Sequence, residues 1–308
     1  MPSRLLRGLV LVLCAFTFLL VLMGGLVHNT HSSLACPDWP LCYGQVFPKM
    51  VGGVLVEHSH RLLAGLVLLL TSVLVILLAS KSARENDRRW GWLGAIALFC
   101  VAFQAVLGGI TVMYRLPTIV STTHLAVSMI FFSILIYLAV ALRPQTEPAA
   151  HPFSVGRITA WTAIAIYVQM VLGALLRHLG GGLACSDLPL CHGQLWPFAE
   201  HPIVRLHMLH RLLALAVLVL VCIAAVHTYR RTSQRSVRLL ALSGLLLALL
   251  QVGLGVLSVF SLLDVAPVTA HLGVAALLLG DFVLLHLLTR RRQRRSAPLL
   301  TSAPGLPA

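Results

Sequence analysis

The sequence of 308 residues contains little charge. Only 10% of the residues are Asp, Glu, Lys or Arg, whereas 58% are hydrophobic and the mean hydropathy is +0.92. Soluble domains carry about 25% charged residues, so this composition excludes an ordinary soluble domain. Eight apolar runs of about 20 residues, each able to cross a hydrocarbon core of about 30 Å, predict instead an all-α polytopic membrane protein. The runs cover residues 5–27, 55–79, 91–113, 119–142, 158–177, 203–226, 237–260 and 266–289.

The first apolar run lacks the Ala-x-Ala cleavage site of a secretory signal peptide. Arg4 and Arg7 precede it, as basic residues precede the apolar part of a signal peptide, but the run is long enough to cross a membrane. We therefore interpret residues 5–27 as the first of eight transmembrane helices.

Acidic residues are scarcer than basic ones, nine against 23, and the net charge is +14 at pH 7. Seventeen of the 23 lysines and arginines flank the apolar runs on one side of the predicted membrane. The positive-inside rule makes that side cytoplasmic, together with both termini, in a multi-pass protein of the plasma membrane. Cations in such positions set the topology and contact anionic lipid of the bilayer, so we expect no nucleic-acid partner. The basic segments are the N-terminus and residues 81–89, 143–157, 230–238 and 290–295.

The two halves of the sequence resemble each other. The stretch ACPDWPLCYG at 35–44 returns as ACSDLPLCHG at 184–193, and EHSHRLLAGLVL at 57–68 returns as HMLHRLLALAVL at 207–218. The duplication extends through the apolar runs and predicts two duplicated four-helix bundles. The chain divides into an N-terminal half (1–142), a cytoplasmic linker (143–157), a C-terminal half (158–290) and a basic, flexible cytoplasmic tail (291–308).

Both copies of the cysteine motif lie in loops on the predicted outer face, where an oxidising compartment allows disulfides to persist. We expect Cys36 to pair with Cys42, and Cys185 with Cys191. The five residues between the cysteines do not give the Cys-x2-Cys spacing of zinc sites or of covalent haem attachment, which argues against a metal. A metal site and pairs of reduced or redox-active thiols remain the alternatives.

A finer repeat combines glutamine, glycine and histidine. Three odd-numbered runs contain a glutamine followed four residues later by a glycine, while the first run keeps only the glycine, and each even-numbered run carries a histidine near its outer end. The glycines either make room for a flat macrocycle or allow close helix packing. The residues are Gly24 and His60, then Gln104, Gly108 and His124, then Gln169, Gly173 and His210, and finally Gln251, Gly255 and His271.

Each half therefore presents two histidines from two different helices. Such a pair, projecting inward in a four-helix bundle, can hold a haem iron from both sides. A single intramembrane histidine is often only a polar residue bonded to a neighbouring helix, but four at symmetric positions favour haem, because polar groups at this depth are costly. Another metal would need carboxylates or thiolates nearby, and the first half offers only Glu57. The second half contains Asp281, a deeper intramembrane acid that we interpret as a proton-path or packing residue.

Glu57 distinguishes the halves, because the second half has His207 at the matching position. Glu57 lies three residues before His60 and hence on the same helix face, which suggests a chemical role for an acid beside the first site. A favourable interaction with the helix dipole is the alternative. Arg61 and Arg211 follow the histidines and either neutralise haem propionates or extend to the membrane interface.

Eight apolar runs, the duplication, the motifs EHSHR, HMLHR, THLA and AHLG, and the loop motif CPDWPLC together resemble the haem A synthase family of bacteria, in its cysteine-bearing type. The resemblance covers nearly the whole chain. Members of that family oxidise the methyl group at ring position 8 of haem O to a formyl group and so supply haem A to haem-copper oxidases. The resemblance thus implies an oxidoreductase of cytochrome oxidase biogenesis, with an outer-loop disulfide between Cys36 and Cys42.

Carried onto this chain, the resemblance implies that His210 and His271 ligate a resident haem b in the C-terminal half. His60 and His124 would line or ligate the site for the substrate haem O in the N-terminal half, and Glu57 would be the acid at that site. Haem O would enter sideways from the bilayer, two successive hydroxylations would yield haem A, and a membrane electron donor would act through haem b.

Candidate partners are the preceding haem O synthase, cytochrome oxidase assembly factors and further copies of this chain. Two other function classes also fit paired histidines. One is a diheme b-type electron carrier linked to quinone, which has no use for a one-sided Glu57. The other is a haem transporter or chaperone, which would bind haem reversibly without altering it.

Overall fold

The structure, a computed structural model, describes residues 3–143 and 153–290. Within these residues it contains eight long helices, each long and apolar enough to cross a membrane, and a short 3-10 helix η1. The expected all-α polytopic membrane protein is therefore confirmed. The elements are α1 (Ser3–Asn29), α2 (Gly52–Glu85), α3 (Arg89–Met113), α4 (Thr118–Ala141), α5 (Phe153–His178), η1 (Gly181–Leu183), α6 (Pro202–Arg231), α7 (Arg235–Phe260) and α8 (Val265–Arg290).

The helices differ from the apolar runs mainly at the ends that carry basic residues. α2 and α6 continue to Glu85 and Arg231, several residues beyond the apolar runs, because helical hydrogen bonding does not stop where apolar sequence stops. α5 begins at Phe153, so its first turn lies in the segment expected to be the linker. Residues 144–152 of that linker and the expected tail, 291–308, lie outside the described residues.

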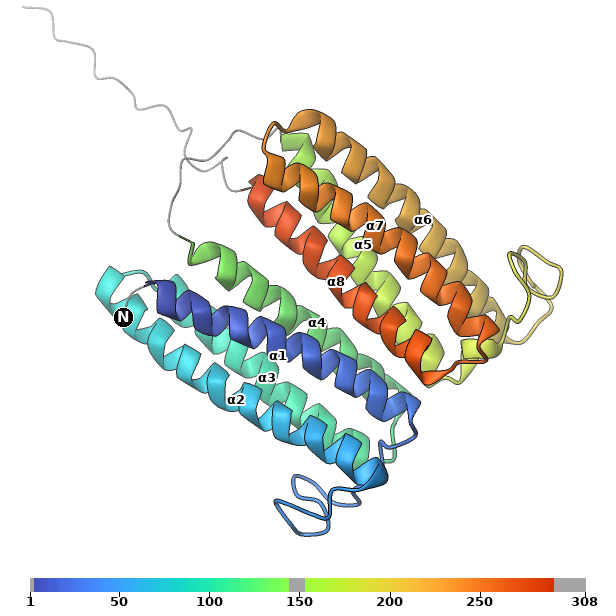
Figure 1. The fold of residues 1–308 in the computed structure, drawn as a ribbon, viewed down its shortest axis with the longest axis horizontal. Helices are drawn as coiled ribbons and strands as arrows, with labels where there is room; N and C mark the ends of the chain where they lie inside the picture. Colours follow the sequence, from blue (N-terminus) through green and yellow to red (C-terminus); the bar gives the residue numbers. More distant parts are fainter. Residues whose placement is uncertain (1–2, 144–152, 291–308) are drawn as a thin grey trace, which may run out of the picture.

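The chain forms two groups of four helices, α1–α4 and α5–α8 (Figure 1). In each group consecutive helices pack together, and the first helix also packs against the fourth. The second and fourth helices of each group therefore face each other diagonally across a bundle. This arrangement matters because the matched histidines all lie on even-numbered helices.

The two groups meet along a seam at which α8 packs against α1 and α4, and α4 also packs against α5. Small residues allow the close approach: a Cβ added to Gly273 of α8 would lie 2.5 Å from Cδ2 of Leu22, and one added to Gly280 would lie 3.1 Å from Cε1 of Phe132. Glycines at helix interfaces serve this purpose in membrane proteins, where dispersion contacts replace the hydrophobic effect.

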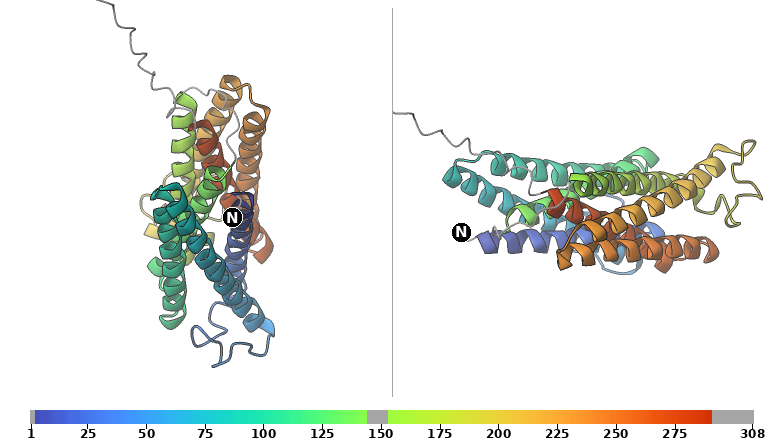
Figure 2. Two further views of the ribbon diagram at one scale, coloured as in Figure 1. Left: turned by 90° about the vertical axis from the view of Figure 1, so that its left-hand side faces the viewer. Right: turned by 90° about the horizontal axis from the view of Figure 1, so that it is seen from above.

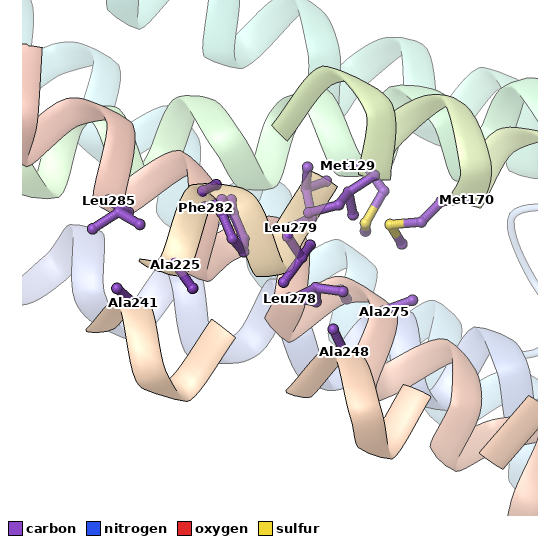
Figure 3. Close-up of a cluster of buried hydrophobic side chains, with 14 of the residues drawn as sticks. Met129, Met170, Ala225, Ala241, Ala248, Ala275, Leu278, Leu279, Phe282 and Leu285 are labelled. Atoms are coloured by element: carbon purple, nitrogen blue, oxygen red, sulfur yellow. The ribbon is translucent and has the colours of Figure 1, made fainter. Parts of the chain in front are cut away.

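Buried apolar side chains fill both bundles and continue through the seam. One cluster joins α1 to α2, α3 and α4. A second cluster lies within α5–α8 but also includes Val21 of α1 and Met129 of α4, and Figure 3 shows Met129 beside Met170 of α5. The halves are therefore packed into one body rather than linked only by the chain.

Both cysteine loops, residues 30–51 and 179–201, lie at the same end of the molecule, which we call the loop end (Figure 1). The helices run lengthwise between the loop end and the opposite end, where the N-terminus lies (Figure 2). The placement of both loops at one end agrees with an even number of helices between them.

Candidate functional site

The four matched histidines come together as two pairs. In the first half His60 of α2 and His124 of α4 lie close enough for a charge on one ring to act on the other. The same holds for His210 of α6 and His271 of α8 in the second half. All four side chains are only partly buried, and each pair projects from the two diagonal helices of its bundle. The structure thus brings together the residues that the sequence predicted as pairs.

Each histidine lies against the glycine of the preceding helix. A Cβ added to Gly24 would lie 3.5 Å from Cε1 of His60, and one added to Gly108 would lie 3.6 Å from Cε1 of His124. The four glycines therefore make room for an imidazole from the next helix. This contact is a form of the close packing that the sequence allowed. The corresponding distances are shorter in the second half, 2.8 Å for Gly173 and His210, and 3.1 Å for Gly255 and His271.

The repeated glutamines contact the histidines as well, a role that the sequence pattern alone did not reveal. In the second half the contacts reach the rings: Nε2 of Gln169 is 3.0 Å from Nδ1 of His210, and Nε2 of Gln251 is 3.1 Å from Nε2 of His271. In the first half Nε2 of Gln104 donates to the main-chain oxygen of the histidine, at 2.7 Å. α1 has a leucine at the corresponding position, so His60 has no such partner.

The ring nitrogens of these histidines fit axial ligation of a haem iron, which requires one free lone pair from each imidazole. Nδ1 of His60, of His124 and of His271 is buried without a hydrogen-bond partner among the described residues. His210 contacts Gln169 through Nδ1, and no described residue bonds its Nε2. Each of the four rings therefore has at least one nitrogen without a hydrogen-bond partner among the described residues.

Glu57 is directed at the first cysteine loop. Its Oε2 accepts a hydrogen bond of 2.9 Å from the backbone N–H of Cys36, and its Oε1 forms an ion pair with Arg61. The carboxylate is 4% exposed, so both oxygens are satisfied inside the protein. Glu57 thus anchors the loop one turn from His60, a structural role that neither sequence interpretation had included.

Arg61 and Arg211 bind loop carbonyls. The Arg61 guanidinium donates to the carbonyl oxygens of Cys36, Asp38 and Leu41, at 3.3, 2.6 and 2.5 Å. Arg211 donates in the same way to the carbonyl oxygens of Cys185, Asp187 and Leu190, at 2.5, 2.6 and 2.9 Å. Three carbonyls occupy each guanidinium, so these arginines hold the loops rather than project to the membrane interface.

His207 takes the place of Glu57 in the second half. Its Nδ1 is 3.3 Å from the backbone nitrogen of Cys185, the counterpart of Cys36, and 3.0 Å from the carbonyl oxygen of Gly181. Both halves therefore anchor the loop at this position, through a carboxylate paired with Arg61 in the first half and through an imidazole in the second.

Each cysteine loop is closed by a disulfide, Cys36–Cys42 in the first half and Cys185–Cys191 in the second. This confirms the expected pairing over the reduced-thiol and metal alternatives. His58 has a ring nitrogen close to both sulfurs of the first disulfide, but disulfide sulfurs are not thiolate ligands.

An aspartate organises the turn inside each loop. Asp38 accepts hydrogen bonds from the backbone N–H groups of Gly44 and Tyr43, and these bonds hold the pKa of Asp38 below its ordinary value. Asp187 accepts from Gly193 and His192, with the same effect on its pKa. The two loops are thus built alike in their turns as well as in their disulfides.

Trp39 marks a difference between the loops that the sequence analysis did not single out. Its ring lies against α3, so a Cβ added to Gly109 would be only 3.0 Å from Trp39 Cδ2. The matching residues in the second half are Leu188 and Val256. Comparing the two copies of the loop motif could have shown this exchange of a large loop residue and a small helix residue.

Asp281 lies deep in α8, 9% exposed, and receives a hydrogen bond of 2.8 Å from Oγ of Ser243. Its Oδ2 is buried without a hydrogen-bond partner among the described residues. A Cβ on Gly244 would lie 2.8 Å from that oxygen, so the glycine of α7 makes room for the acid. These contacts of Asp281 are with α7, which packs against α8 within the second bundle.

Comparison with known proteins identifies the family. The family model described as COX15-CtaA, cytochrome oxidase assembly protein, matches residues 7–52 and 49–283. The chain belongs to this family.

Relatives of similar length carry the name Heme A synthase. The protein of Bacillus licheniformis is 30% identical over 306 residues, which cover 95% of this chain and 99% of the relative. The protein of Geobacillus thermodenitrificans is 32% identical, with 91% and 90% of the two chains covered, and that of Symbiobacterium thermophilum is 31% identical, with 88% and 91% covered. The similarity to these members of the COX15-CtaA family therefore extends over both halves.

Proposed function

We propose that this protein is a haem A synthase, an oxidoreductase that converts the C8 methyl group of haem O into the formyl group of haem A. The observation that carries the proposal is the presence of two histidine pairs at matching positions of the two bundles, with different glutamine and glycine contacts around the rings. Family membership and the names of the relatives support the same activity. A supply of haem A to haem-copper oxidases agrees with the family description, cytochrome oxidase assembly protein.

The resident haem b belongs, in this proposal, to His210 and His271. Both imidazoles are oriented by a glutamine at 3.0 or 3.1 Å and are packed tightly against a glycine. Ligands that are fixed before binding lose less freedom on binding, which favours a permanently held group. When bound, haem b supplies one-electron transfer between a membrane donor and the substrate site.

The substrate haem O belongs to His60 and His124. Their rings receive no hydrogen bond from a described residue, and their glycines leave more room. A site that must accept substrate and release product is better served by ligands that are less rigidly held. Each of the two successive hydroxylations would use one dioxygen, two protons and two electrons from the membrane donor to insert one oxygen atom into a C–H bond of the methyl carbon and release the other as water. The resulting gem-diol loses one further water to become the aldehyde.

Glu57 is the proposed acid at the substrate site, as proton donor or acceptor. It lies one turn from His60 on the same helix, and the ion pair with Arg61 fixes its orientation. Since it also bonds the N–H of Cys36, any change at Glu57 would be transmitted to the first cysteine loop.

We place the loop end on the outer face of the plasma membrane and both termini in the cytoplasm, because basic residues flank the helices at the other end. Haem O enters laterally from the bilayer, since its farnesyl tail is lipid-soluble. A membrane electron donor, haem O synthase, cytochrome oxidase assembly factors and a homo-oligomer are the proposed partners.

The test is to express the full chain with a haem O synthase in cells that lack haem A. The chain is purified, and the extracted haems are identified by chromatography and mass. The expected result is haem b together with haem A or its hydroxylated precursor.

Two other results would contradict the proposal. About two haem b per chain, with haem O unchanged in the membranes, would indicate a diheme electron carrier. Haem O bound reversibly and recovered unaltered would indicate a transporter or chaperone.

A further inference from the structure

Six polar residues gather at the loop end, where the two halves meet, and we call them the polar seam cluster. They come from the last turns of α1 and α5 and from the first turns of α4 and α8. The members are His28, Asn29, Thr118, Arg177, His178 and Thr269.

The polar seam cluster joins the halves through side chains. The rings of His28 and His178 meet edge to face, with centroids 4.8 Å apart. Nη2 of Arg177 donates to Oδ1 of Asn29 at 3.2 Å, and Nδ2 of Asn29 donates to Oγ1 of Thr269 at 3.1 Å. Side chains of α1, α5 and α8 are thus linked by direct contacts, and Thr118 of α4 joins them through the carbonyl oxygen of His178.

The cluster contains one guanidinium, that of Arg177, and two imidazoles, but no acid. None of the described carboxylates forms an ion pair with Arg177, and its Nε is buried without a hydrogen-bond partner among the described residues. Arg177 is partly buried, and a guanidinium shielded from water is costly to leave without a counter-charge. Arginine presents its N–H groups in a fork that matches a carboxylate, so the missing partner has the chemistry of a carboxylate.

The cluster also lies directly beside both histidine pairs. His28 follows Gly24 by four residues and Arg177 follows Gly173 by four, so each lies one helical turn toward the loop end from a glycine that contacts a histidine. His178 is an electrostatic neighbour of His124. A carboxylate carried by a group bound at either pair would thus lie about one helical turn from side chains of the cluster.

The two arginines nearest to the histidines in sequence are already engaged. Arg61 and Arg211 each donate to three loop carbonyls, and Arg61 also pairs with Glu57, so most of their N–H groups are directed at the loops. Arg177 differs from them: its hydrogen bond goes to the side chain of Asn29, and its buried Nε has no hydrogen-bond partner among the described residues.

We propose that the polar seam cluster is a carboxylate-binding site for the propionates of the iron porphyrins held in the two halves, with Arg177 as its principal ligand. The inference rests on the proposed haem binding and adds the residues that orient the macrocycles. It places one shared guanidinium, with its polar neighbours, between the two haems, so that both would be held at the loop end by the same group of side chains.

The test compares two probes, ferric protoporphyrin IX and its dimethyl ester, in which the propionates are blocked. Full-length apoprotein from haem-deficient cells is titrated with each probe, and binding is followed by the Soret absorbance. Wild-type protein should bind the free acid roughly tenfold or more tightly than the ester, the effect of a charge-assisted hydrogen bond. Arg177→Gln should lose most of this preference and bind the ester as wild type does.

Two further variants separate charge from structure. Arg177→Lys keeps the charge and should retain part of the preference, whereas Lys49→Gln removes a charge from an exposed position on the first loop and should retain all of it. The reduction potential of bound haem should fall in Arg177→Gln, because a nearby cation favours the ferrous form; a merely structural role would not require this.

Equal binding of acid and ester by wild-type protein, or an unchanged preference in Arg177→Gln, would overturn the carboxylate site while leaving haem binding intact. Failure of the wild-type protein to bind either probe would overturn the proposed function and this inference together.

Discussion

In the second half a Cβ on Gly173 or Gly255 would lie 2.8 or 3.1 Å from the facing imidazole, whereas in the first half the corresponding distances are 3.5 and 3.6 Å. Glutamine side chains contact the ring nitrogens in the second half and do not in the first. The duplication therefore preserved the positions of the histidines and changed how firmly they are held.

In the loops, by contrast, the contacts are alike in both halves and the differences lie in single residues. Their disulfides, aspartate turns and arginine contacts are the same in both halves, but Glu57 is replaced by His207 and Trp39 by Leu188. The two halves thus share a scaffold and differ in ring contacts and in a few residues beneath the loops, a difference that fits the proposed assignment of one permanent and one exchangeable site.

The largest expected effect is at Glu57. Glu57→Ala should keep haem b bound but abolish conversion of haem O, whereas His207→Ala should leave conversion largely intact. The reason is that the anchoring residue is an acid only in the first half, where it is Glu57; in the second half it is His207. The measurement is the haem A to haem b ratio in purified protein, with disulfide content as a control for loop integrity.

Glu57→Gln distinguishes the two roles of this side chain. An amide oxygen can still accept from Cys36 N–H, but it carries no charge. Loss of conversion with an intact loop would support the proton role. Conversion at the wild-type level would remove Glu57 from the chemistry and leave it as a loop anchor.

A smaller effect is expected from filling the glycine contacts. Gly173→Ala should reduce haem b occupancy several-fold, because its Cβ would press on His210 at 2.8 Å and overpacking costs about 1–3 kcal/mol. The matched change Gly24→Ala places a Cβ at an ordinary 3.5 Å from His60 and should leave haem b unchanged. Haem b is quantified as the pyridine hemochrome; equal losses in both variants would contradict the difference in tightness.

The smallest effect concerns a feature that the halves share. Backbone N–H groups lower the pKa of Asp38 and Asp187, so each ionised carboxylate stabilises its loop above the ordinary pKa of about 3.9. That contribution should be lost as the pH falls below about 4 and the carboxyl groups become protonated. Phosphine reduction of both disulfides should then accelerate to a similar degree, and a strong acceleration of one alone would show that the loops are not equivalent.

Much of this organisation could be predicted from the sequence, because its signals are strong ones. Hydropathy gave eight spans, and the repeat placed four histidines at matching positions that the structure brings into two pairs. Helix ends were less predictable: α2 extends to Glu85 because a helix continues past its membrane-spanning part.

The side-chain partners could not be predicted in the same way. Arg61 and Glu57 bind backbone groups of a loop more than 15 residues away, and no periodicity encodes such contacts. The polar seam cluster joins His28 to His178 across the two halves, a contact that depends on how the bundles pack. The internal repeat shows which position of one half matches which position of the other, but it does not show which side chains touch across the halves.

The most direct test of the difference between the halves is the haem content of His60→Ala and His210→Ala, each co-expressed with a haem O synthase and purified. We predict that His60→Ala retains haem b near the wild-type amount and contains no haem A, whereas His210→Ala loses haem b. Loss of haem b from His60→Ala, or its retention in His210→Ala, would contradict the assignment of the resident haem to the second half.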